Sequence, residues 1–99
     1  VKFVLMNNRS LGMVRQWQET FHNERRSASV FTKQPNFGQL AEAYGISSVR
    51  IETPDQLTNH LASALLEPGA RLIEVLISPT EHVLPMIPPG KANHEMIGV

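Results

Sequence analysis

Phe3-Val-Leu-Met-Asn-Asn-Arg-Ser-Leu-Gly-Met-Val-Arg-Gln-Trp17 is the stretch of this sequence that decides its fold. It opens with an apolar run that is typical of a buried strand, and it closes with apolar residues at helical spacing. Two adjacent carboxamides, Asn7 and Asn8, lie where the strand gives way to the helix. In an open α/β sheet, the carboxyl end of a strand faces a crevice in which ligands bind. Amide oxygens there can bind a hard cation, although asparagine is also common as a simple turn former.

Helix and strand signals continue along the rest of the chain. Asn36 can cap a helix that Gly45 ends in a left-handed conformation. Thr53 can cap the next helix, with Pro54 at its first position and Gln56 at its third. The predicted elements are a strand at 2–6, a helix from 11 to about 25, a helix at 37–44, a strand at 47–52, a helix at 54–66 and a strand at 72–77.

The order of these elements predicts the α/β class, because crossovers of this length favour parallel strands with right-handed connections. We predict a partial three-layer α/β/α arrangement with a parallel sheet over residues 1–78. Its first and last strands should be buried on both faces, apart from Glu74. An apolar sheet edge stays open in such a half-sheet, and the chain begins at Val1 directly on a strand. We therefore expect a fragment whose other half lies upstream.

Residues 79–99 form a separate, proline-rich C-terminal arm in this prediction. Five of its first twelve residues are Pro79, Pro85, Pro88, Pro89 and Gly90. These residues should exclude regular structure while keeping the backbone stiff. The arm must then lie on another surface to be ordered.

Charge and composition argue against several classes of protein. Nine Lys plus Arg balance nine Asp plus Glu, so no basic surface indicates a nucleic-acid partner. No apolar run approaches the ~20 residues of a membrane helix, so no membrane partner is expected. The lack of cysteine fits a reducing compartment, and we expect a cytoplasmic location. The four histidines lack the spacing of a zinc site and are expected at the surface.

Two motifs give the chain a specific resemblance. Asn7-Asn8 is followed by Leu11-Gly12-Met13-Val14 and Gln16-Trp17, and His82-Val-Leu-Pro-Met-Ile-Pro-Pro-Gly90 lies near the end. Together they resemble the C-terminal part of the large catalytic subunits of acetolactate synthase, also called acetohydroxyacid synthase. The resemblance covers essentially the whole chain. It implies the second half of a domain that binds thiamine diphosphate.

The resemblance also implies a metal and cofactor site. In that family a divalent cation, Mg²⁺, holds the cofactor's diphosphate through an upstream Asp, the second Asn of the pair and a backbone carbonyl. These last two correspond to Asn8 and to the carbonyl of Ser10, while Asn8, Gly12 and Met13 are expected beside the cofactor. The upstream Gly-Asp-Gly motif is not in this chain, and neither is the family's activating Glu. No catalytic residue is therefore expected here.

A substrate and herbicide channel is the second site that the resemblance implies. Its expected wall is Met13, Val14 and Trp17, and the arm with Pro89 and Gly90 is expected to fold over it. From spacing alone, an apolar stripe on a helix is more simply explained as core. The family's Trp favours 2-ketobutyrate as the second substrate.

The implied reaction joins the two-carbon unit left by decarboxylation of pyruvate to a second 2-ketoacid, in branched-chain amino acid biosynthesis. The implied partners are the remainder of the catalytic subunit, including a middle domain that binds FAD, a second copy in a homodimer or tetramer, and a small regulatory subunit. The fragment alone should be inactive. Two alternatives stay open: another thiamine-diphosphate-dependent carboligase or 2-ketoacid decarboxylase, and a non-catalytic regulatory or interaction domain built around the proline tail.

Overall fold

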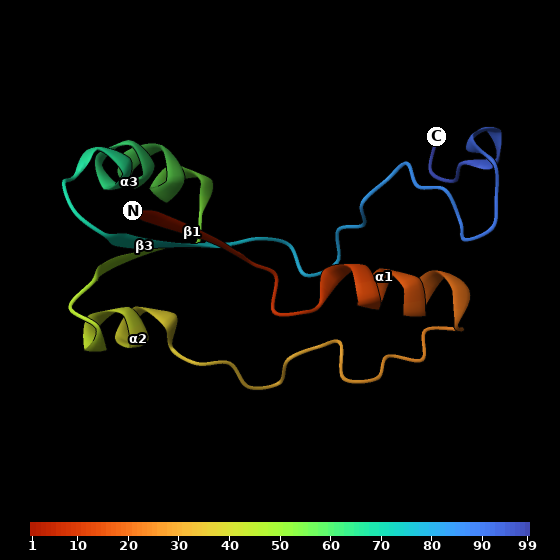
Figure 1. Cartoon of the computed structure of the whole chain (residues 1–99), viewed down its shortest axis with the longest axis horizontal. Helices are drawn as coiled ribbons and strands as arrows, with labels where there is room; N and C mark the ends of the chain where they lie inside the picture. Colours follow the sequence, from red (N-terminus) through yellow and green to blue (C-terminus); the bar gives the residue numbers. More distant parts are fainter.

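The computed structural model describes all residues from 1 to 99, and its elements follow the predicted order (Figure 1). They are β1 (Lys2–Asn7), α1 (Gly12–Phe21), α2 (Phe37–Ala43), β2 (Ser47–Ile51), α3 (Pro54–Leu66), β3 (Arg71–Leu76) and a short 3-10 helix, η1 (Asn93–Glu95). None of the helices combines the length and the apolarity that crossing a bilayer requires.

The strands form one parallel sheet in which β3 lies between β1 and β2. Leu72 of β3 pairs with Phe3 of β1 and with Ser48 of β2, which defines the register. Because side chains alternate along a strand, Ile73 faces one side of the sheet, and Leu72 and Glu74 face the other. The predicted parallel pairing is confirmed. The outer edge of β1 has no partner strand.

Helices α3 and α2 cover opposite faces of this sheet (Figure 1). Ala64 of α3 packs on Ile51 and Ile73, and these three buried residues form the core. The other face carries α2 and an apolar cavity of about 190 Å³ lined by Phe3, Phe37, Leu40, Ala41, Tyr44, Ile46 and Leu72. The predicted α/β/α layering is therefore confirmed.

The helix signals read from the sequence are also confirmed. The Oδ1 of Asn36 accepts a hydrogen bond from the backbone N of Gln39, at 3.0 Å. The Oγ1 of Thr53 accepts one from the backbone N of Gln56, at 3.3 Å. Gly45 has a φ of 70°, the left-handed conformation that only glycine adopts without cost.

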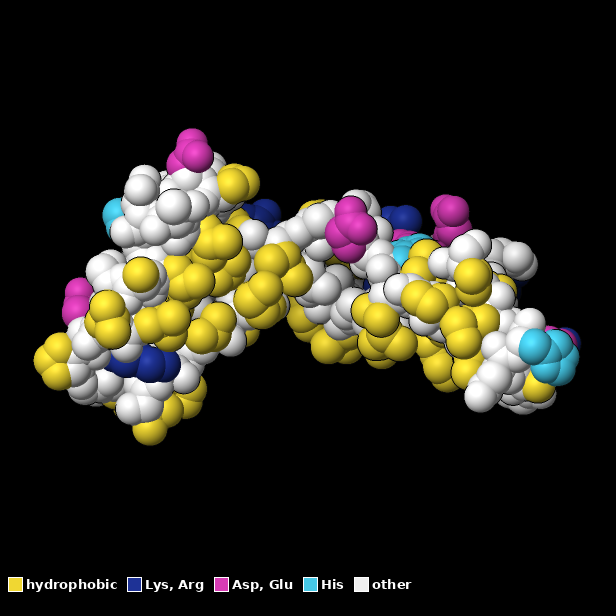
Figure 2. Space-filling model, turned by 90° about the horizontal axis from the view of Figure 1, so that it is seen from above, with side chains coloured by type: hydrophobic (Ala, Val, Ile, Leu, Met, Phe, Trp, Pro, Cys, Tyr) yellow, Lys and Arg dark blue, Asp and Glu magenta, His cyan; other side chains and the backbone are white.

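Helix α1 lies apart from the sheet, beside the C-terminal tail (Figure 1). The radius of gyration is 17.1 Å, whereas a compact domain of this length has one of about 13 Å. The accessible surface is 7216 Å², against about 5,700 Å² for a compact monomer of this mass. Figure 2 shows hydrophobic side chains spread over both parts of this elongated molecule. Much apolar surface is therefore uncovered in this chain.

Several predictions of local structure are wrong. The first concerns β1, which was expected to be buried on both faces. Phe3, Val4 and Met6 are 51%, 50% and 56% exposed, because β1 is an edge strand and the helices α2 and α3 pack on β2 and β3.

The second concerns the end of α1, which lies at Phe21 rather than near Arg25. Asn23 and Glu24 have φ values of 52° and 57°, and a helix cannot continue through left-handed residues. The backbone N of Glu24 instead turns back to the carbonyl of Gln18, at 3.1 Å.

The third concerns the tail, which does contain regular structure. The 3-10 helix η1 forms after the last proline, and Met86 and Ile97 form an antiparallel bridge. Glu95 caps η1 by accepting a hydrogen bond from the backbone N of Ala92, at 2.9 Å. The prolines restrict only the first half of the tail, since residues 91–99 contain none.

Candidate functional site

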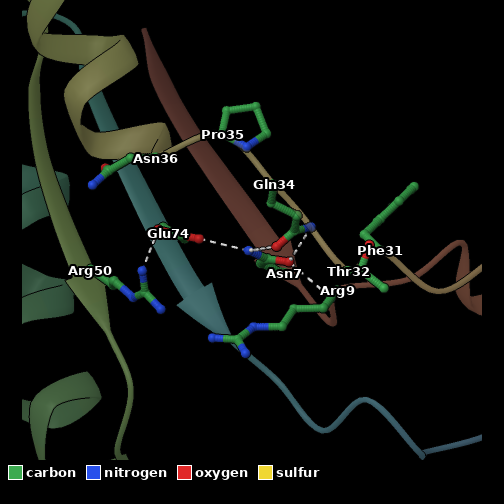
Figure 3. Close-up of a pocket in the computed structure, with 9 residues that line it drawn as sticks. All are labelled: Asn7, Arg9, Phe31, Thr32, Gln34, Pro35, Asn36, Arg50 and Glu74. Carbon is green, nitrogen blue, oxygen red and sulfur yellow. Dashed lines mark hydrogen bonds and ion pairs between the residues drawn. The ribbon is translucent and has the colours of Figure 1, made fainter.

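Asn7, the first of the two amides, is buried at the end of β1 and fully engaged within the protein (Figure 3). Its Nδ2 donates to Glu74 Oε1 at 2.7 Å and to Gln34 Oε1 at 3.2 Å. Its Oδ1 accepts from the backbone N of Arg9 at 2.9 Å and from Gln34 Nε2 at 3.2 Å. A carboxamide has two N–H donors and two acceptor lone pairs, so none is left over. Asn7 therefore serves the structure of the turn.

Glu74 is a polar residue whose position the sequence did not explain. It was predicted as the exception to burial in its strand, but it is only 5% exposed, so that prediction is wrong. The carboxylate accepts from Asn7 and lies 3.9 Å from Arg50 Nη1. Asn7, Arg9, Arg50 and Glu74 border a polar cavity of about 290 Å³ (Figure 3). A buried carboxylate needs such partners. Asn7, an amide on the same face of the adjacent strand, was the signal in the sequence that could have predicted the burial of Glu74.

Asn8, the second amide, lies at the crevice that the fold predicts for a ligand. It borders a cavity of about 200 Å³ at the carboxyl ends of β1 and β3, together with Leu76, Ile77 and Pro79. Its Oδ1 accepts one hydrogen bond, from the backbone N of Ser10 at 3.1 Å. The second lone pair of this oxygen has no protein partner, so it is open to a cation.

The turn after Asn8 offers further oxygen atoms. The carbonyl of Arg9 accepts from Phe31 N at 2.9 Å, but no hydrogen bond of the protein reaches the carbonyl of Ser10. Ser10 Oγ is buried and has no hydrogen-bond partner. Hard cations such as Mg²⁺ bind oxygen ligands, and amide and carbonyl oxygens are among them. The donor set of Asn8 and Ser10 therefore fits such an ion, and it is incomplete without ligands from elsewhere.

Gly12 is the residue that allows Asn8 to hold this position. A Cβ on Gly12 would lie 2.7 Å from Asn8 Nδ2, closer than side chains pack. The sequence gives no sign of this close approach, which brings together residues four apart. Gly12 thus contributes to the site by leaving space.

Met13, Val14 and Trp17 form an open apolar face on α1. They are 49%, 47% and 42% exposed and border a hollow of about 410 Å³ with Gln18 and His22. Trp17 packs edge-on against the ring of Phe21, with the ring centroids 6.2 Å apart. Within this chain the face is a surface feature rather than core.

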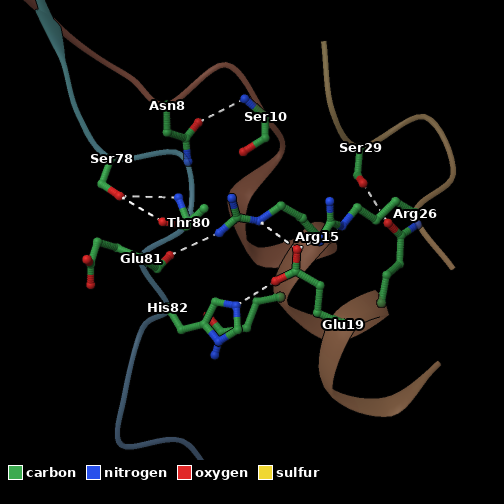
Figure 4. Close-up of polar contacts among 12 residues, drawn as sticks. Asn8, Ser10, Arg15, Glu19, Arg26, Ser29, Ser78, Thr80, Glu81 and His82 are labelled. Atoms are coloured by element: carbon green, nitrogen blue, oxygen red, sulfur yellow. Dashed lines mark hydrogen bonds and ion pairs between the residues drawn. The ribbon is translucent and has the colours of Figure 1, made fainter. Parts of the chain in front are cut away.

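The opposite side of α1 holds the C-terminal tail (Figure 4). Arg15 and Gln16 are buried there, and Arg15 Nη2 donates to the carbonyl of Glu81 at 3.2 Å. Pro89 and Gly90 lie farther along the tail and border neither the cavity at Asn8 nor the hollow at Met13. The structure therefore brings Met13, Val14 and Trp17 together, but not with Pro89 or Gly90.

Glu19 connects α1 with the tail and with the loop that follows α1. Its carboxylate accepts from His82 Nε2 at 2.6 Å and pairs with Arg15 at 3.5 Å and with Arg26 at 3.0 Å. The hydrogen bond from His82, followed by the charges of Arg15 and Arg26, lowers the pKa of Glu19 below its ordinary value of 4.5. Sequence reasoning placed His82 among surface histidines and did not find this contact.

We expect the tail to loosen from α1 in acid. Because its pKa is lowered in the folded chain, the Glu19 carboxylate contributes stability above pH 4.5, and that contribution is lost as the pH falls through the lowered value. In an NMR titration, the Val83 amide signal should therefore shift as the pH falls below 4.5.

The Glu19→Gln variant provides the control, because it keeps an acceptor for His82 but cannot ionise. Its Val83 signal should not shift in this acid range. A titration that persists in Glu19→Gln would contradict the assignment and would point to another carboxylate, such as Glu95, whose pKa is also lowered by its hydrogen bond from Ala92.

Comparison with protein families shows which family this chain belongs to. Residues 1–75 match the family described as thiamine pyrophosphate enzyme, C-terminal TPP binding domain. The chain belongs to this family of thiamine pyrophosphate enzymes. Thiamine pyrophosphate is another name for thiamine diphosphate, so the resemblance seen in the sequence is confirmed. The matched residues include the turn at Asn8 and the whole of α1, and residues 79–99 of the tail lie beyond them.

Among individual proteins, the chain is similar to large subunits of acetolactate synthase. The chain is 59% identical over 99 residues to the acetolactate synthase large subunit of Lactococcus lactis, covering 100% of this chain and 17% of that protein. It is 42% identical over 100 residues to the large subunit of Porphyra purpurea, again covering 100% and 17%. It is 43% identical over 97 residues to the isozyme 2 large subunit of Escherichia coli, covering 98% and 18%. The chain thus spans about a sixth of the length of these relatives.

Proposed function

We propose that this chain is the C-terminal segment of an acetolactate synthase large subunit. The proposed enzyme decarboxylates pyruvate and joins the remaining two-carbon unit to a second 2-ketoacid, pyruvate or 2-ketobutyrate. The observation that supports this best is the turn in which Asn8 Oδ1 and the Ser10 carbonyl are open for a cation. It occurs in a chain whose 99 residues are all covered by a match of 59% identity to an acetolactate synthase large subunit.

Each part of the chain has a proposed role in this reaction. Asn8 and the Ser10 carbonyl bind Mg²⁺, and Gly12 and Met13 lie beside the cofactor. Bound thiamine diphosphate supplies stabilisation of the negative charge that remains when a 2-ketoacid loses carbon dioxide. Met13, Val14 and Trp17 form an apolar wall that excludes water and fits the second substrate.

The remaining assignments concern organisation. Residues 1–78 are the proposed half-domain, and residues 79–99 are an arm that places Pro89 and Gly90 over the substrate channel. The proposed partners are the rest of the catalytic subunit with its FAD-binding domain, a second copy in a homodimer or tetramer, and a small regulatory subunit. The proposed location is the cytoplasm.

The two alternatives have less support. A different carboligase or decarboxylase is not favoured, because the relatives described above are all named acetolactate synthases. A peptide-presenting domain needs the proline segment to be free. Instead, Met86 in that segment contacts Gln16 and pairs with Ile97.

A chimeric large subunit tests the proposed function. In it, this chain replaces the matching 17% of the Lactococcus lactis protein. With thiamine diphosphate, Mg²⁺ and FAD, the chimera should form acetolactate from pyruvate, whereas the chain alone should form none, since it lacks the upstream Asp ligand and the activating Glu. A folded chimera without activity, beside an active parent, would contradict the function. Acetolactate formation by the chain alone would contradict the division of roles.

A further inference from the structure

Gln16 connects α1 to the tail by a closed pair of hydrogen bonds. Its Nε2 donates to the carbonyl of Val83 at 3.0 Å, and its Oε1 accepts from the backbone N of Val83 at 2.7 Å. The same Nε2 also contacts Met86 Sδ. The side chain is only 1% exposed. A buried amide with both of its ends engaged fixes its partner in position as well as in distance.

Most of the other contacts that fix the rotation of α1 are also to the tail, apart from the hydrogen bonds of Gln18 with Ser27 and Ser29. The helices that pack on the sheet are α2 and α3, and α1 lies beyond the ends of the strands (Figure 1). At its start, Leu11 N donates to the Ser29 carbonyl, at 2.8 Å. Along its length, the buried residues are Arg15 and Gln16, both under the tail. The tail therefore holds one side of the helix.

The apolar face lies on a different side of the same helix. Successive residues of an α-helix point about 100° apart, so Met13, Trp17 and Phe21 form a stripe away from Arg15 and Glu19. A helix held on one side cannot roll about its axis. Any roll would move the Trp17 ring, because a bulky side chain lies far from the axis.

We propose that Gln16 is a positioning residue that fixes the rotation of α1 and so sets where Trp17 meets the second substrate. This inference rests on the proposed function of the apolar face. Gln16 itself does not touch the substrate, since it is buried beneath Val83. Its effect reaches the substrate only through the face that Met13 and Trp17 form.

The product ratio of the chimera tests this proposal, with pyruvate and 2-ketobutyrate in competition. Gln16→Ala removes both hydrogen bonds to Val83 and should lower the share of the 2-ketobutyrate product by about 3-fold or more. Gln16→Glu keeps an acceptor for Val83 N, so its product ratio should lie between the ratios of Gln16→Ala and the unsubstituted chimera. Gln56 lies on the distant α3, and Gln56→Ala removes the one hydrogen bond that its Oε1 accepts from Glu52 N, so this variant should leave the ratio unchanged.

A double variant separates positioning from simple structural support. If Gln16 acts through Trp17, then Gln16→Ala should cause no further change of ratio in a Trp17→Leu background. An equal fall in both backgrounds would overturn the proposal, and so would an unchanged ratio in a folded, active Gln16→Ala chimera.

A second measurement does not depend on activity. Trp17 is the single tryptophan of the 99-residue chain, so its fluorescence anisotropy decay reports the motion of α1. Gln16→Ala should increase the amplitude of its fast decay while the far-ultraviolet circular dichroism stays unchanged. An unchanged decay would overturn the proposal. An inactive unsubstituted chimera would instead contradict the proposed function, and the decay would still test Gln16.

Discussion

Replacing Asn8 with alanine in the chimeric large subunit is expected to weaken Mg²⁺ binding by about 10- to 100-fold. The Oδ1 of Asn8 accepts one hydrogen bond in the chain and has a lone pair free for the cation, and the alanine variant has no such oxygen. Thiamine diphosphate binding should weaken with the metal, because the cation holds its diphosphate in the proposed site. Titrating Mg²⁺ into the apoenzyme at fixed cofactor concentration measures the effect.

The neighbouring Asn7 gives a matched control. Asn7→Ala removes the same group one residue earlier, but it leaves the buried Glu74 without its closest donor. Loss of a partner to a buried polar group costs about 1–3 kcal/mol of stability. Asn7→Ala should thus lower the denaturation midpoint with little direct effect on the metal, and Asn8→Ala should do the reverse. Equal Mg²⁺ affinity in Asn8→Ala and the parent would refute the ligand assignment.

This contrast between the two amides also marks where prediction from sequence ends. Helix starts are local, so a cap such as Asn36 or Thr53 could be identified from a few residues, and the structure contains both. Strand and helix order then defined the parallel α/β class. The amide pair itself was visible, but the sequence did not distinguish the structural Asn7 from the open Asn8. That distinction depends on Glu74 and Gln34, which lie 67 and 27 residues away along the chain.

The surroundings of α1 were predicted less well, for the same reason. Its apolar stripe was correctly identified, yet a stripe indicates only that one side prefers an apolar contact. Which side the tail takes is decided by the contacts of Gln16 with Val83 and of Glu19 with His82, across more than sixty residues. Likewise, the apolar composition of β1 predicted burial that this chain alone does not provide. Such side chains fit a strand that further structure covers.

Replacing Trp17 with leucine in the chimera should lower the preference for 2-ketobutyrate over pyruvate as the second substrate. The two substrates differ by one methylene, which an apolar wall distinguishes by only ~1–3 kcal/mol, or about 5- to 150-fold. Pyruvate self-condensation should stay largely intact, because the smaller substrate depends less on the wall. Both products can be measured in one competition assay.

The unfolding free energy of the Trp17→Leu variant distinguishes a substrate wall from a core residue. Trp17 is 42% exposed and packs mainly on Phe21, so leucine should change the unfolding free energy only slightly if the face is a substrate wall. If the assembled enzyme instead buries Trp17 in its core, truncation leaves a cavity that costs about 3–5 kcal/mol, with an unchanged product ratio. Trp17→Phe keeps an aromatic edge and should retain most of the preference. A large loss of stability at constant product ratio would therefore exclude the channel wall, because the ring would then be acting on folding alone.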